Sequence, residues 1–157
     1  MLISSLKDLF SRDLGRLSKE IQSYKDEKNL WIIDKDILNS GGNLCLHLIG
    51  NINTFIGAGL GKTGYVRDRP AEFNTKDVPV SEMVKMIEDT KVMVNKTLSN
   101  LSASDLEKEY PMIVFQKPMT TTFFLIHLAG HLTYHLGQVN YHRRLLDNGS
   151  LDAQERR

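Results

Sequence analysis

The sequence predicts an all-α protein, a four-helix bundle in a single domain that spans residues 1–157. Three observations predict it. Four long segments carry apolar residues at steps of three and four, no segment makes a convincing strand, and two long connectors interrupt the periodic segments. A chain of 157 residues with 41% hydrophobic and 25% charged residues suits one continuous core.

The first two helices are expected over residues 2–24 and 43–57. The apolar stripe of the first consists of Leu2, Leu6, Leu9, Phe10, Leu14, Leu17 and Ile21. The connector over residues 25–42 breaks this period, and Trp31 and Ile32 are expected to tuck against the bundle. Ser40 is the expected N-cap of the second helix, which the glycines from Gly57 onward end.

The third helix follows a long loop over residues 57–78 that has little apolar periodicity. Pro79 marks the start of this helix, which is expected to end at about Asn100. Its apolar stripe consists of Met83, Ile87, Val94, Leu98 and Leu101.

The fourth helix is expected over residues 121–149, after a second connector over residues 102–119. One of the threonines at 120–122 caps it, and Asn148-Gly149 is the stop signal. Gly130 and Gly137 inside this helix predict close packing against a neighbour, because an exposed glycine costs helix stability.

Composition excludes several classes of function. Twenty basic against 19 acidic residues give no electrostatic footprint for nucleic acid. Cys45 is the only cysteine, so no disulfide can form within the chain. Lys7 and Asp8 argue against a signal peptide, and no apolar run is long enough for a membrane span. The expectation is a cytoplasmic protein that binds neither nucleic acid nor membrane.

The stretch from Gly59 to Val66 matches the kinase glycine-rich loop and the dinucleotide fingerprint in its letters, and from Gly57 it looks like a P-loop. A P-loop requires glycine at position 56, where this chain has Ile56, and it requires a preceding strand, where this chain has a helical pattern. The same missing strand excludes a dinucleotide fold, and the kinase motifs are absent from the chain. We therefore interpret the glycines as a helix end with positive-φ residues and a turn.

Five histidines are the strongest chemical signal in the sequence. His127, His131, His135 and His142 lie on one face of the fourth helix, and His47 lies on the apolar face of the second. A single such histidine is usually a hydrogen-bonded core residue, but several converging imidazoles favour a metal ion, which satisfies them together. Spacing alone leaves two candidate pairs, 127/131 and 131/135, each awaiting a third ligand from a facing helix.

The segment "HLTYHLGQVNYHRRLL" (131–146) resembles the last helix of the DinB/YfiT-like superfamily, whose signature is H-x-x-x-H followed by Gly-Gln. The segments "GNLCLHLIGNINTFIGAGL" and "YVRDRPAEF" resemble a bacterial subfamily of it. The resemblance covers most of the chain and implies an up-down-down-up bundle, often dimeric, with a divalent metal on His47, His131 and His135. By the same resemblance, His127 and His142 are core or outer-sphere residues.

The resemblance implies a thiol-dependent transfer, with bacillithiol, mycothiol or glutathione, or a hydrolysis. An ion such as Zn²⁺ or Ni²⁺ would activate a thiol or water against a small electrophile. Asn51 and Gln138 are expected to orient ligands or bind substrate, or else to link helices. Arg67 and Arg69 are expected either to bind an anionic substrate or to hold their loop against the bundle through an acidic partner such as Glu72. The alternatives are a stress-linked metal-binding bundle without turnover and a structural dimer with histidines in its core.

Overall fold

The computed structural model describes residues 1–147, and this part of the chain is all-helical, as predicted. The elements are α1 (Leu2–Gln22), the 3₁₀ helix η1 (Glu27–Trp31), α2 (Gly41–Ile52), its π-helical extension η2 (Asn53–Ala58), α3 (Arg69–Asn74), α4 (Val80–Ser99), α5 (Ala103–Glu107) and α6 (Thr121–Leu146). Extended pairing within residues 1–147 is limited to one isolated bridge between Glu109 and Thr120.

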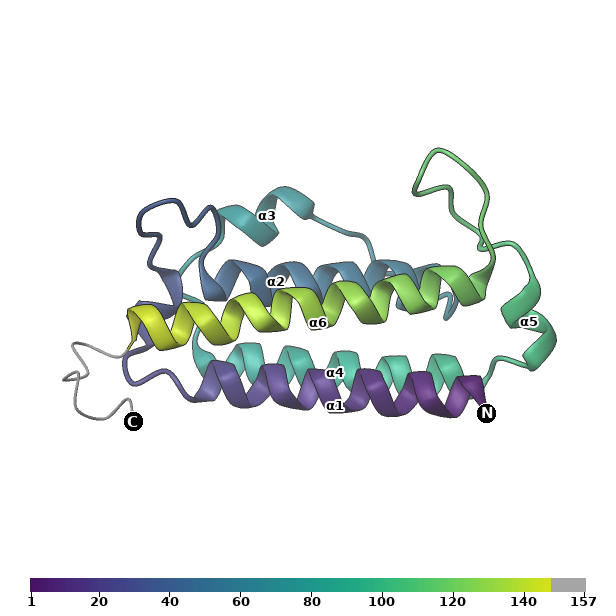
Figure 1. Ribbon diagram of the computed structural model, residues 1–157, viewed down its shortest axis with the longest axis horizontal. Coiled ribbons are helices and arrows are strands. Elements are labelled where there is room, and N and C mark those ends of the chain that lie inside the picture. The colour runs from purple at the N-terminus through teal and green to yellow at the C-terminus, as the bar shows by residue number, and fades with distance from the viewer. Residues whose placement is uncertain (148–157) are drawn as a thin grey trace.

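Helices α1, α2, α4 and α6 lie side by side along the long axis of the molecule (Figure 1). Helix α1 packs against α4 and α6, and α2 packs against the same two helices. Helices α1 and α6 run in one direction, and α2 and α4 run in the other. Helix α5 caps the end of the molecule nearest the N-terminus, and α3 lies on the outer side of α2. None of the helices in the described residues has the length and apolarity that a membrane crossing requires.

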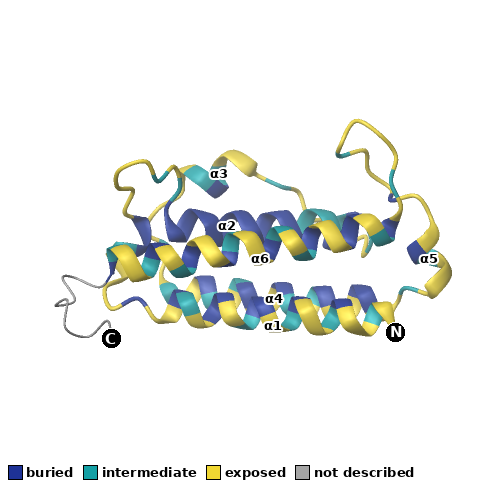
Figure 2. Cartoon of the chain, in the orientation of Figure 1, coloured by how far each residue is buried: buried dark blue, intermediate teal, exposed yellow. Residues whose placement is uncertain are grey.

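Helix α2 is the most enclosed element, since every residue from Gly41 to Ile52 is buried (Figure 2). Besides the long helices, α3 and η1 cover it. A Cβ atom at Gly42 would lie 2.6 Å from the Trp31 ring, so only glycine lets that ring lie on the helix. Trp31 is buried as expected, whereas Ile32 is 36% exposed, and the prediction for Ile32 is therefore wrong.

Side-chain caps fix the starts of two long helices where the sequence predicted them. The Ser40 hydroxyl accepts a hydrogen bond from the backbone N–H of Asn43 (3.1 Å), and the Thr120 hydroxyl accepts one from that of Phe123 (3.2 Å). Pro79 directly precedes α4, also as predicted. The predicted stop of α6 at Asn148-Gly149 lies outside the described residues.

The prediction that Gly130 and Gly137 pack closely against a neighbour is wrong. Both are exposed on α6, and a Cβ atom at either would meet nothing within 4 Å. Close approach occurs instead on α2, where the helix is covered on all sides and Gly41, Gly42 and Gly50 each face a side chain within 2.6 Å of the Cβ position. A glycine in these helices therefore indicates close packing only where the helix around it is buried, as in α2.

The loop over residues 57–78 contains the short helix α3, which the sequence analysis did not anticipate. It forms because the Asp68 carboxylate caps the N–H of Ala71 (3.0 Å) and Pro70 fits the first turn. The interpretation of the glycine stretch as a turn is confirmed, since Lys62 and Gly64 have φ of 53° and 75°. This stretch follows the helical turn η2, so the strand that a nucleotide loop requires is not there.

Candidate metal centre

Helices α2 and α6 bring three histidines together near the middle of the molecule. His47 stands on α2, and His131 and His135 stand on successive turns of the facing helix α6. The ring of His47 lies 5.2 Å from each of the other two rings, which lie 4.5 Å from one another. One ligand atom from each histidine lies within 4.8 Å of the other two. The three residues that the family resemblance indicated are therefore neighbours in space.

The spacing of these nitrogens fits a small divalent cation. Zinc binds imidazole nitrogen at about 2.0–2.1 Å, so two ligands of a tetrahedral ion lie about 3.3–3.4 Å apart. The Nε2 atoms of His47 and His131 are 3.4 Å apart. The other ring nitrogen of His131, Nδ1, is buried and has no hydrogen-bond partner. Three nitrogen donors that converge in this way could hold a metal ion.

Burial keeps the imidazoles of His47 and His131 in the form that binds metals. Burial is the main cause that lowers the pKa of His131 to about 4, and the neighbouring His135 and His47 contribute to this lowering. Burial also lowers the pKa of His47, although the carboxylate of Glu72 opposes this effect. A metal ion requires the neutral imidazole, which is the form both histidines hold at neutral pH.

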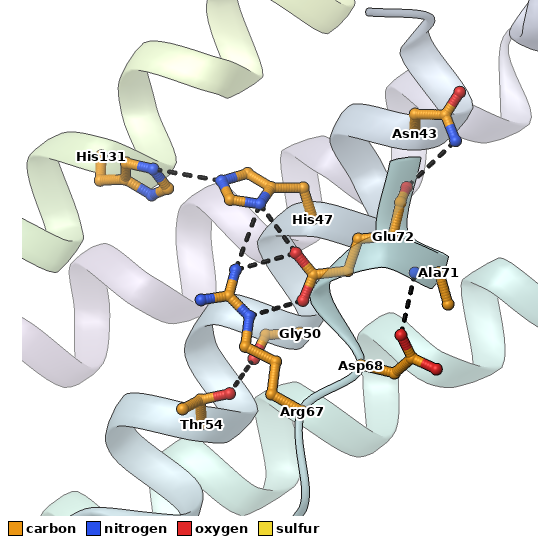
Figure 3. Close-up of polar contacts among 9 residues, drawn as sticks. All are labelled: Asn43, His47, Gly50, Thr54, Arg67, Asp68, Ala71, Glu72 and His131. Carbon is orange, nitrogen blue, oxygen red and sulfur yellow. Dashed lines mark hydrogen bonds and ion pairs between the residues drawn. The ribbon is translucent and has the colours of Figure 1, made fainter. Parts of the chain in front are cut away.

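Glu72 fixes the orientation of His47 (Figure 3). Its Oε2 atom lies 3.0 Å from Nδ1 of His47, and because a carboxylate only accepts, we assign the proton of His47 to Nδ1, which then donates it. The Nη2 atom of Arg67 also lies 3.3 Å from this Nδ1, but it donates to Oε2 of Glu72 at the shorter distance of 2.8 Å. The lone pair of His47 is therefore on Nε2, the atom that faces His131. Arg67 donates to both oxygens of the same carboxylate, at 2.6 and 2.8 Å. Such a carboxylate behind a metal-binding histidine raises its basicity and holds its ring in place.

The sequence around α3 explains how a carboxylate reaches α2. A Cβ atom at Gly50 would lie 2.0 Å from Oε1 of Glu72, so the glycine leaves the space that the carboxylate occupies. The side-chain amide of Asn43 donates to the backbone carbonyls of Glu72 (3.0 Å) and Thr75 (2.8 Å). These bonds join the end of α3 to the start of α2 and leave Glu72 buried beside His47.

His135 has an equivalent partner on its own helix. Its Nδ1 atom donates to the Gln138 carbonyl oxygen at 2.6 Å, which leaves the Nε2 lone pair available. The amide nitrogen of Gln138 donates in turn to the hydroxyl of Tyr134 (3.2 Å). Gln138 thus lies where the sequence analysis expected a residue that orients a ligand. Asn51, also singled out from the sequence, is 8% exposed, and its Oδ1 atom has no hydrogen-bond partner.

The remaining two histidines lie outside this cluster. His142 is buried, its Nε2 donates to the carbonyl of Ile32 (2.9 Å), and its Nδ1 accepts from the hydroxyl of Tyr24 (2.7 Å). His142 is therefore a hydrogen-bonded core residue. His127 is exposed and stacks on Phe124, with ring centroids 5.9 Å apart. Of the two pairs that the spacing left open, the structure places 131/135 with His47.

The two arginines predicted to bind substrate occupy different positions. Arg67 is half-buried and holds Glu72, as the loop-tying alternative expected. Arg69 is exposed, with its guanidinium 5.3 Å from the ring of Phe73, which itself lies 5.1 Å from the ring of His47. A role for either arginine in substrate binding stays a prediction. Cys45 is fully buried, and burial raises its pKa to about 12, so it is no nucleophile.

The fold and the site define a class: an all-helical protein with three histidines, from two facing helices, that could hold a metal ion. The chain belongs to the family described as protein of unknown function DUF1572, whose model matches residues 2–153. No curated protein matches the sequence.

Glu72 is the residue whose role sequence reasoning missed, since it was considered only as an arginine partner. Gly50 carried a usable signal, because a glycine inside an apolar helix marks a place where another group approaches the backbone. The identity of that group was not readable, because Glu72 is 22 positions further along the chain and belongs to a short helix without apolar periodicity.

Proposed function

We propose that the protein is a metalloenzyme that binds a divalent ion, Zn²⁺ or Ni²⁺, on His47, His131 and His135. The observation that carries this proposal is the convergence of three imidazoles, two of which have their non-ligating nitrogen already engaged. Structural zinc sites use four protein ligands, whereas three leave a position for a reactant. The bound ion would supply the Lewis acidity that makes a thiol or water reactive at neutral pH.

We further propose that the reaction transfers a low-molecular-weight thiol, of the bacillithiol or glutathione type, to a small electrophile. Hydrolysis of such an electrophile is the alternative reaction. A cavity of about 380 Å³, which shares Gln138 with the centre but is not lined by the three histidines themselves, supports the use of a small substrate. Gln138, the partner of His135, is part of its wall, and most of the remaining wall is apolar: Ile37, Leu38, Leu44, Tyr141 and Leu145.

We also propose that α1, α2, α4 and α6 constitute the up-down-down-up bundle of the DinB/YfiT-like superfamily. The helix directions, with α1 and α6 running opposite to α2 and α4, and the placement of the histidines on the second and last long helices support this assignment. A homodimer that works in the cytoplasm, where thiols stay reduced, is part of the same proposal.

Metal analysis of the purified protein tests the first step. After reconstitution with zinc, the wild type is expected to hold one ion per chain, and His47→Ala and His131→Ala are expected to hold none. His127→Ala is the matched control, because this histidine is exposed on the same helix and outside the cluster. A wild type without stoichiometric metal would contradict the proposal, and it would favour a protein whose histidines are core groups.

Incubation of the zinc-loaded protein with a thiol and an aryl halide tests the second step. The thioether conjugate is expected with the wild type and is expected to be lost in His131→Ala. A loaded protein that forms no conjugate and hydrolyses no ester would contradict the enzyme, and it would favour the stress-linked metal-binding bundle without turnover.

A further inference from the structure

Two of the three candidate ligands have an acceptor behind the ring, and the third does not. His47 donates to Glu72, and His135 donates to Gln138. The Nδ1 atom of His131 has no partner. Among residues 1–147, only one other buried side-chain nitrogen or oxygen lacks a partner, and it is the Oδ1 atom of Asn51. Buried polar atoms without partners are rare, so two of them near one centre require an explanation.

The helix register places Asn51 opposite His131. Helices α2 and α6 run antiparallel, and His47 faces His135 with their rings 5.2 Å apart. One turn forward along α2 and one turn back along α6, Asn51 and His131 form the equivalent pair. Beyond the end of α2, Phe55 of η2 also meets α6, where its ring lies 5.2 Å from that of Phe124.

The proton positions leave Asn51 and His131 no bond to form with one another in the absence of a metal. The lone pair of His47 is on Nε2, because its Nδ1 donates to Glu72. The Nε2 atom of His131, 3.4 Å away, can therefore only be the donor of that pair. Its Nδ1 is then a lone-pair acceptor, and the carbonyl oxygen of Asn51 is an acceptor too. The two atoms are not in hydrogen-bond contact in this structure, and with these proton positions neither could donate to the other.

We propose that Asn51 is the positioning residue of His131 in the metal-loaded protein. When Nε2 of His131 becomes a ligand, its proton is lost to solvent and Nδ1 takes one up, so the ring stays neutral and only the tautomer changes. Nδ1–H is then a donor, and Oδ1 of Asn51 accepts from it. Each of the three ligands then has one outer-sphere acceptor: Glu72, Gln138 or Asn51. This inference rests on the metal binding proposed above.

The variant Asn51→Leu separates this role from a structural one. It removes the acceptor and fills a similar volume with apolar atoms. In the absence of metal it is expected to be at least as stable as the wild type, because the unpaired amide oxygen is gone. Its zinc affinity is expected to fall about 10- to 100-fold, as for other outer-sphere partners of metal ligands. Asn51→Asp keeps an acceptor and is expected to retain more of the affinity.

Asn53→Leu is the matched control, and the opposite result is expected for it. Asn53 lies two positions further along the chain, and its amide donates to the carbonyl of Ile49 and to the hydroxyl of Thr90. The Leu variant is therefore expected to lose stability in urea without metal and to keep the zinc affinity of its folded state. Zinc affinity is measured by competition with a chromogenic chelator.

Nitrogen-15 NMR of labelled histidine gives a readout that turnover cannot give. In the wild type, His131 is expected to be protonated on Nε2 without metal and on a hydrogen-bonded Nδ1 after zinc is added. In Asn51→Leu, the Nδ1 signal should lose its hydrogen-bond shift. Zinc binding by Asn51→Leu within twofold of the wild type would overturn this inference alone. A wild type that binds no zinc would overturn the proposed function and, with it, this inference.

Discussion

The replacement Glu72→Gln tests whether the carboxylate on α3 holds the centre in its binding form. The side chain keeps its length, and its single oxygen can still accept from His47. Its amide group, however, faces the donor nitrogens of Arg67, which now donate to both carboxylate oxygens. The expected loss of zinc affinity is about 10-fold, the low end of the range for outer-sphere partners, and equals about 1.4 kcal/mol. Glu72→Ala removes the acceptor entirely and is expected to approach 100-fold.

The same replacement is expected to destabilise the metal-free protein. Arg67 and Glu72 have side chains that are 17% and 5% exposed, so the variant leaves a largely buried guanidinium without its counter-charge. Breaking a buried pair costs about 3–5 kcal/mol, and the water that still reaches Arg67 places the expectation near 3 kcal/mol. Urea unfolding measures this cost, and Glu107→Gln, an exposed glutamate at the end of α5, is the control. Unchanged zinc affinity in both Glu72 variants would refute the assignment.

Three further outcomes follow from the same geometry. Gly50→Ala pushes a methyl group against the Glu72 carboxylate, so zinc affinity and stability are both expected to fall, the latter by about 1–3 kcal/mol in urea unfolding; an unaffected variant would contradict the close approach. Gly137→Ala points into open space and is expected to stabilise the protein by up to about 1 kcal/mol, and a loss would show a contact there. Burial lowers the pKa of His131 to about 4 and lowers that of His142, so the unfolded chain binds more protons between about pH 4 and 6.5. Stability of the metal-free protein is therefore expected to fall as the pH falls through that window, and an equal urea midpoint at pH 7 and pH 5 would exclude this.

Local periodicity was enough to predict the long helices and the spacing of the α6 histidines. Positions four apart in a helix share a face whatever the rest of the chain does, so His131 and His135 had to be neighbours. Their meeting with His47 depends on how two helices pack, and no local pattern contains that information. The family resemblance supplied the third ligand, and the structure brings the three side chains together.

The outer partners of the centre were predictable only in part. Gln138 lies three residues from His135 on one helix, so its proximity follows from helix geometry. Glu72 reaches His47 from α3, which has six residues and is too short to show an apolar period. The prediction from Gly130 and Gly137 was wrong because glycine within a helix is a local signal that does not show which side of the helix is buried. Both glycines lie on the exposed side of α6.

The attachment of α3 also sets where the chain tolerates added length. Hydrogen bonds of Asn43 and Glu72 attach α3 directly to α2. The position of α3 therefore does not depend on the preceding stretch over residues 61–66, which is exposed throughout. Gly64 in this stretch meets no other atom at its Cβ position. Doubling the length of a flexible loop costs only about 0.6 kcal/mol. A tag or a small domain inserted after Gly64 should therefore leave the histidine centre intact, which makes this loop the natural attachment point for a reporter.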